Sequence, residues 1–115
     1  MSHFLVEFAA IIRSHTVKTE TGPGQKAVER YELRLLDGSR LVTYESRKET
    51  KFKYSYQWMT AANETIYRWD NTPHFPEFDT YPSHRHVGAD ELAEPFSFVS
   101  LRDVLTFIAQ RLTSG

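Results

Sequence analysis

The stretch VERYELRLLDGSRLVTYES, residues 28–46, decides the fold class because it holds two alternating segments joined by a tight turn. Apolar side chains at positions 31, 33 and 35 alternate with charged side chains at 30, 32 and 34. This period of two is typical of a strand with one buried face. Asp37-Gly38 follows, and an Asp-Gly pair between alternating segments is a strong hairpin signal. We therefore predict antiparallel strands over 28–36 and 40–46.

Two more alternating segments follow this hairpin. In KFKYSYQWMT, residues 51–60, aromatic side chains at every second position alternate with lysines and small polar residues. TIYRW, residues 65–69, alternates in the same way. Because short turns separate these segments, we predict consecutive strands in an antiparallel meander.

Both ends of the chain have helical spacing. Apolar residues at 4, 5, 8, 11 and 12 predict a helix from about Ser2 to Arg13, with Ser2 as its N-cap. A β-branched stretch then predicts a short strand near 15–21. The SLRD spacing at 100–103 resembles a capping box and opens a closing helix. The fold class is α+β: a meander of about five antiparallel strands, with the N- and C-terminal helices packed on one face.

Length and composition are those of one globular domain, residues 1–115. The net charge of −1 means that nucleic-acid or lipid binding needs a local basic patch. The absence of cysteine excludes disulfides, thiolate zinc sites and cysteine nucleophiles. The longest apolar run, residues 8–12, is too short to span a membrane, and the N-terminus lacks a signal-peptide pattern. We expect a cytoplasmic protein without a membrane segment.

The segment RWDNTPHFPEFDTYPSHRH, residues 68–86, concentrates ionisable and rigid side chains. It contains three of the five histidines, two aspartates and three prolines. The pattern predicts a loop of about eighteen residues, and loops of that length in small domains are usually functional or disordered. The prolines and aromatic residues argue against disorder.

An acid–base site is the first functional interpretation of this loop. If the chain is extended there, His84 and His86 project to the same side. Two imidazoles can serve as general base and general acid in ribonuclease-type phosphoryl transfer. Arg68 or Arg85 would then stabilise the charge of the phosphorane.

Two other interpretations stay open. His74, Asp70 and Asp79 are near enough in sequence to converge on the histidine pair, and imidazoles with an aspartate can bind a divalent metal. We favour acid–base chemistry or RNA contact over a metal, because His-x-His without a helical HExxH context is a weak signal. We therefore expect no metal and no cofactor. In the purely structural alternative, Asp70 builds an Asx turn and the histidines bond nearby carbonyls.

The strand over residues 51–58 suggests a second, weaker site. Lysines that alternate with aromatic residues are typical of surfaces that stack single-stranded bases. However, a period of two places Lys51 and Lys53 on the face opposite the aromatic residues, which are better explained as core. Lys51, Lys53 and Arg85 remain candidates for RNA contact. The basic turn at 47–48 is expected to be solvated.

Four motifs resemble one known family. They are YSYQW at 54–58, RWDNTPHF at 68–75, YPSHRH at 81–86 and LRDVL at 101–105. Together they are similar to the TumE-like proteins, toxin components of bacterial and archaeal toxin–antitoxin pairs that are usually encoded beside a helix-turn-helix antitoxin. The close match covers about half of the chain. It departs from the family pattern at Gln57, Phe75 and Ser83, where that pattern has histidine.

The resemblance implies a toxin-like role and a helix-turn-helix antitoxin as partner. RNA is the target we favour, because the side-chain inventory suits phosphoryl transfer without a cofactor, as in a metal-independent ribonuclease. The predicted catalytic residues are Arg68, Asp70, His74, His84 and His86. Alternatively, the loop is a non-catalytic docking surface with Phe75, Phe78 and Tyr81 exposed. A free sheet edge would also allow a homodimer.

Overall fold

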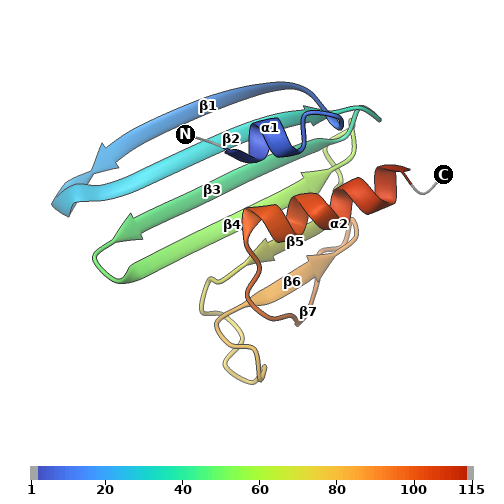
Figure 1. Cartoon of the computed structure of the whole chain (residues 1–115). Helices are drawn as coiled ribbons and strands as arrows, with labels where there is room; N and C mark the ends of the chain where they lie inside the picture. Colours follow the sequence, from blue (N-terminus) through green and yellow to red (C-terminus); the bar gives the residue numbers. More distant parts are fainter. Residues whose placement is uncertain (1–2, 114–115) are drawn as a thin grey trace.

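The computed structural model describes residues 3–113 and contains one seven-stranded antiparallel sheet, whose strands follow one another in chain order (Figure 1). None of the described helices is long and apolar enough to cross a membrane. The elements are α1 (His3–Glu7), β1 (Ile12–Gly22), the 3₁₀ turn η1 (Pro23–Gln25), β2 (Lys26–Leu35), β3 (Arg40–Lys48), β4 (Lys51–Met59), β5 (Thr65–Asp70), β6 (His84–Val87), β7 (Leu92–Pro95) and α2 (Leu101–Thr113).

The β2–β3 hairpin forms at the Asp-Gly turn as predicted. The backbone of Leu35 bonds to that of Ser39, and Leu33 lies opposite Leu41. Gly38 has a φ of +88°, a conformation that other L-residues rarely adopt. The Asp37 carboxylate accepts the Ser39 backbone N–H at 2.9 Å, which holds the turn closed.

Both helices lie on one face of the sheet (Figure 1). The predicted α+β class and the predicted placement of the helices are therefore confirmed. In α1, Phe4 packs edge-on against Tyr31 of β2, with ring centroids 4.9 Å apart. In α2, the Phe107 ring lies 5.7 Å from that of Trp69. The core between helices and sheet is made by side chains that are almost fully buried, chiefly Leu33, Leu35, Leu41, Tyr56, Trp58, Trp69, Val104, Leu105 and Ile108.

The capping box before α2 is confirmed. The Ser100 hydroxyl accepts the Asp103 backbone N–H at 3.1 Å, and the Asp103 carboxylate accepts the Ser100 backbone N–H at 2.9 Å. This reciprocal pair satisfies two donors at the start of the helix, where no backbone acceptor is available.

The N-terminal helix is shorter than predicted. It ends at Glu7, a turn follows, and β1 begins at Ile12 instead of near residue 15. Ile11 is buried and Ile12 pairs with Leu35 of β2, so sheet pairing of β-branched residues prevails over the helical spacing. Ser2, the predicted N-cap, lies outside the described residues.

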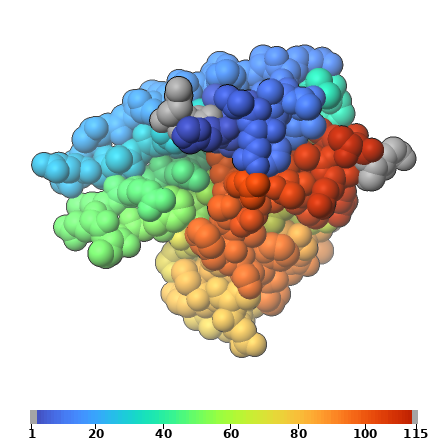
Figure 2. All heavy atoms as spheres, in the orientation of Figure 1, coloured from blue at the N-terminus to red at the C-terminus, as the bar shows by residue number. Residues whose placement is uncertain are grey.

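The prediction of five strands is also wrong, because β6 and β7 occupy part of the segment that we expected to be loop and connection. β6 is the four-residue sequence HRHV, which lacks the apolar alternation of a half-buried strand. β7 is equally short and ends in Pro95. Only residues 71–83 remain irregular between β5 and β6. This loop protrudes below the sheet in Figure 2, where it is yellow.

Candidate functional site

Strands β5 and β6 bring four of the predicted catalytic residues together on the sheet face opposite the helices: Arg68, Asp70, His84 and His86. Trp69 of β5 is buried in the helix-side core, so its neighbours Arg68 and Asp70 point the other way. In the β5–β6 register Asp70 lies opposite His84, and Arg68 lies opposite His86. The two-residue spacing of the histidines therefore places both rings beside the carboxylate.

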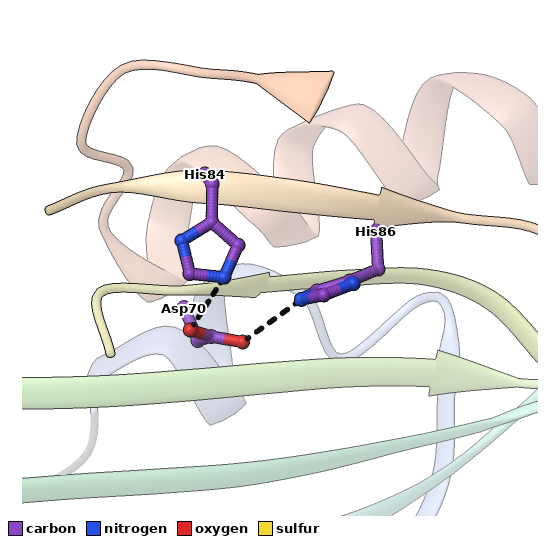
Figure 3. Close-up of side chains that lie close together, drawn as sticks. All are labelled: Asp70, His84 and His86. Atoms are coloured by element: carbon purple, nitrogen blue, oxygen red, sulfur yellow. Dashed lines mark ion pairs between the residues drawn. The ribbon is translucent and has the colours of Figure 1, made fainter. Parts of the chain in front are cut away.

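Asp70 lies between the two imidazoles (Figure 3). Its Oδ1 is 3.0 Å from Nε2 of His84, and its Oδ2 is 3.7 Å from Nε2 of His86. The histidine rings are 4.9 Å apart, measured between centroids. Asp70, His84 and His86 are only 5%, 2% and 9% exposed, so this is an ionisable group largely removed from solvent.

The second nitrogen of each ring faces the backbone. Nδ1 of His84 lies 3.1 Å from the carbonyl oxygen of Pro82, and Nδ1 of His86 lies 3.0 Å from that of Glu91. A carbonyl oxygen only accepts hydrogen bonds, so Nδ1 carries the proton in both rings. Both Nε2 atoms are thereby directed at Asp70. The structural alternative predicted such carbonyl bonds, and they occur together with the convergence on Asp70.

Arg68 supplies the positive charge nearest to the carboxylate. Its Nε is 3.4 Å from Oδ2 of Asp70, and its guanidinium also forms a 2.6 Å ion pair with Glu91. The backbone N–H of Thr72 donates to Oδ1 of Asp70 at 3.0 Å, which is the predicted Asx turn. Asp70 therefore receives contacts from both strands and from the start of the loop.

The loop covers the imidazoles with an aromatic side chain. The centroid of the Phe75 ring lies 4.8 Å from that of His84 and 6.1 Å from that of His86, both in edge-on geometry. The Phe78 ring stacks on the Phe75 ring, with centroids 5.0 Å apart. These rings separate the carboxylate–imidazole group from bulk water.

Two predicted members lie outside this group. His74 is exposed on the loop, and the centroid of its ring is 6.5 Å from that of Phe75. Asp79 is exposed as well. Among the described residues, the clustered potential ligands comprise only Asp70, His84 and His86.

The three candidates for RNA contact do not all lie on the same face of the sheet. Lys51 and Lys53 are exposed on β4. Because Lys53 alternates with the buried Tyr54, it lies on the same face as the site. Arg85 instead packs on the helix side, where it is paired with Glu94 and its guanidinium lies 4.1 Å over the Phe96 ring.

Sequence reasoning missed Glu91, which lies in the turn between β6 and β7. Its carboxylate forms an ion pair with Arg68, and its backbone carbonyl accepts a hydrogen bond from Nδ1 of His86. Both the side chain and the backbone of Glu91 therefore contact site residues. Gly88 opens this turn with a φ of +75°. A glycine shortly after an extended segment was the available signal for a reversal that would bring Glu91 back to the histidines.

Comparison with known families identifies the chain. The family model described as Toxin TumE matches residues 2–112. The chain belongs to the TumE toxin family. No curated protein and no solved structure matches it. Membership makes it a toxin-like component and suggests an antitoxin as partner.

The three positions at which the sequence resemblance implied histidine differ in their relation to the site. Phe75 is the side chain that covers both imidazoles. Gln57 lies opposite Arg68 in the β4–β5 register and donates to the hydroxyl of Thr65 at 2.8 Å. Ser83 is buried and accepts a hydrogen bond from the hydroxyl of Tyr54 at 3.0 Å. Each position has a defined contact without an imidazole.

Proposed function

We propose that this protein is the cytoplasmic toxin component of a toxin–antitoxin pair and that it acts on RNA through Asp70, His84 and His86. One observation supports this site above all others: a buried carboxylate and two buried imidazoles converge from adjacent strands in a member of a toxin family. Ionisable groups buried in this way are frequent at functional sites. Arg68 lies beside the group with a charge suited to a phosphate.

Cleavage of a phosphodiester is the reaction that suits these residues best. In the acid–base version, one imidazole takes the proton of the attacking hydroxyl and the other protonates the leaving oxygen. Arg68 stabilises the charge on phosphorus, and the exposed His74 is available for contact with the RNA. Each working nitrogen must then turn from Asp70 toward the substrate. The metal-independent ribonuclease thus stays a prediction that requires the Phe75 loop to open.

We propose that Lys51 and Lys53 contact the phosphates of the RNA. Both are exposed, and Lys53 is on the site face of β4. A local basic pair is needed because the net charge of the chain is −1. Arg85 is a weaker candidate for this role, since Glu94 and two aromatic rings already engage it on the helix side.

The proposed partner is a helix-turn-helix antitoxin. In the alternative function the loop is a docking surface and carries out no chemistry. Tyr81 favours this alternative because it is 46% exposed at the end of the loop. Phe75 and Phe78 are half-buried and stack on each other, and Phe75 also contacts the two histidines. They therefore form only part of the exposed apolar patch that we predicted.

Induced expression in a bacterial host tests the proposal. We expect the native protein to arrest growth and to cause loss of intact RNA. The double variant His84→Ala/His86→Ala, at matched abundance, should restore growth because it removes both imidazoles from Asp70. His15→Ala is the matched control, since it removes an exposed histidine of β1.

Two outcomes separate the alternatives. Arrest that persists in the double variant contradicts a role of the two histidines. Arrest with intact RNA, relieved by co-expressed antitoxin but unchanged in the double variant, favours the docking function. In that case Tyr81→Ala is expected to weaken binding of the purified antitoxin.

A further inference from the structure

We propose that Asp70, His84 and His86 form a binding site for one divalent transition-metal ion of the zinc type. This goes beyond the proposed function, because it concerns a ligand of the folded protein and holds whatever the cellular target is. It replaces the acid–base version of that function, because an imidazole bound to an ion at Nε2 cannot take or deliver a proton there. It also revises the expectation from the sequence that the site needs no metal. Four features of the described residues carry the inference.

The first feature is the spacing of the potential ligand atoms. One potential ligand atom from each of Asp70, His84 and His86 lies within 4.8 Å of the other two. Two ligand atoms that are each about 2.1 Å from one ion lie roughly 3.0–3.6 Å apart at angles of about 90–120°. The observed separations, 3.0 Å from His84 Nε2 to Oδ1 of Asp70 and 3.7 Å from His86 Nε2 to Oδ2, are close to that range. The site therefore needs only a small closing movement to bind an ion.

The second feature is the orientation of the rings. Both Nδ1 atoms donate to backbone carbonyls, those of Pro82 and Glu91, at 3.1 and 3.0 Å. This arrangement fixes the tautomer in which a neutral imidazole offers its lone pair at Nε2. Metal-binding histidines usually donate their other ring N–H in this way, because the bond orients the ring and increases its basicity.

The third feature is the incomplete hydrogen bonding between the three side chains. A separation of 3.7 Å between His86 Nε2 and Asp70 Oδ2 is too long for a hydrogen bond. Nε2 of His84 and Oδ1 of Asp70 lie 3.0 Å apart. A cation between the three side chains would be bound by both imidazoles and by the carboxylate.

The fourth feature is the surrounding shell. The Phe75 ring packs edge-on against both imidazoles, which limits competition from water. Glu91 is paired with Arg68 at 2.6 Å, so the guanidinium charge beside Asp70 is compensated. Two imidazoles with one carboxylate favour zinc and related transition metals over Mg²⁺ and Ca²⁺, which prefer oxygen ligands. Three protein ligands leave a coordination position for water or a phosphate oxygen.

Zinc titration of the purified, chelator-stripped protein tests the inference. We expect one Zn²⁺ per chain by calorimetry, a higher thermal midpoint with Zn²⁺ than with chelator, and no displacement by excess Mg²⁺. Co²⁺ in place of Zn²⁺ should give the absorption bands of a low-symmetry site with nitrogen ligands. Native protein that binds no stoichiometric Zn²⁺ overturns the proposal.

Single-ligand variants show whether the ion is at this site. Asp70→Asn and His86→Gln each remove one ligand atom with little change of shape, and each should weaken Zn²⁺ binding at least tenfold. His15→Ala, an exposed histidine outside the group, should bind as the native protein does. Unchanged affinity in both ligand variants overturns the assignment.

Circular dichroism establishes whether the variants fold. If neither does, X-ray absorption of zinc-loaded native protein decides, and a spectrum without imidazole scattering contradicts the site. These measurements use neither RNA nor cells. Their failure is therefore distinguishable from failure of the growth experiment: arrest without metal binding overturns only the metal site, and metal binding without arrest overturns only the toxin action.

Discussion

Asp70 is the residue on which the site depends, because it is a buried carboxylate with four different neighbours. His84, His86, Arg68 and the backbone of Thr72 all approach its two oxygens. A buried charge is tolerated only when paired and hydrogen-bonded. The same arrangement thus holds β5, β6 and the loop together and assembles the chemical group.

The tyrosines of β4 give a prediction about alkaline pH. Burial raises the pKa of the Tyr54 hydroxyl above its ordinary value of 10.0, and burial also raises the pKa of Tyr56, whose hydroxyl donates to Glu45 at 2.5 Å. Below the unfolded value the two phenols contribute their full stability. As the pH rises above about 10, ionisation favours the unfolded chain and stability falls.

Ultraviolet difference absorption during an alkaline titration checks this expectation. Tyr54 and Tyr56 should ionise only above pH 10, and together with unfolding. Tyr56→Phe should make the unfolding midpoint less sensitive to pH above 10. Ionisation of every tyrosine at one pH, with the fold intact, would contradict the burial argument.

Helix α2 contributes stability to the fold through one apolar face. Its buried side chains contact the helix side of the sheet, and Ile108 is fully buried there. Ile108→Ala should lower the free energy of unfolding by about 2–5 kcal/mol, because it removes buried methyl groups and leaves a cavity. Urea denaturation measures the loss.

Gln110→Ala is the matched control on the exposed face of the same helix. It should change the free energy of unfolding by less than about 0.5 kcal/mol. Equal effects of the two substitutions would mean that α2 is not packed on the sheet as described.

The short strand β6 is the element that makes the candidate site possible. Its alternation separates His84 and His86 from Arg85, so the histidines face the loop while the arginine joins the helix-side packing. Pairing with β5 on one side and β7 on the other fixes this register. A one-residue slip would exchange the two sets of side chains.

The seven-stranded sheet has two unequal edges. β7 is a four-residue strand ending in proline, whereas β1 runs over eleven residues with exposed side chains. Long uncovered edges can pair with another strand, and short or proline-ended edges resist it. The homodimer that a free sheet edge would allow is therefore expected at β1.

Light scattering over a range of protein concentrations measures this association. We expect a mass that approaches twice 13.4 kDa as concentration rises. Val17→Lys places a charge at an exposed position of β1 and should shift the equilibrium toward the monomer. A monomeric mass at every concentration would exclude the homodimer.

Local patterns predicted much of this protein. The β2–β3 hairpin, the buried aromatic face of β4 and the capping box of α2 all followed from spacing and turn residues, because these features depend on neighbours within a few positions. The histidine spacing also indicated one shared side. The end of α1 at Glu7 did not follow, since pairing of Ile12 with Leu35 is a contact between distant residues.

Tertiary structure alone decided the strand count and the composition of the site. β6 and β7 are strands because neighbouring backbone satisfies their hydrogen bonds, and their own side chains carry little strand signal. Strand pairing placed Asp70 opposite His84 and directed Arg85 to the helix side of the sheet. His74 lies outside the site, whereas Glu91 contacts it through Arg68. The carbonyls that orient the two imidazoles are positioned by the turns of the folded chain. Such convergence depends on long-range pairing, so no local spacing in the sequence specifies it.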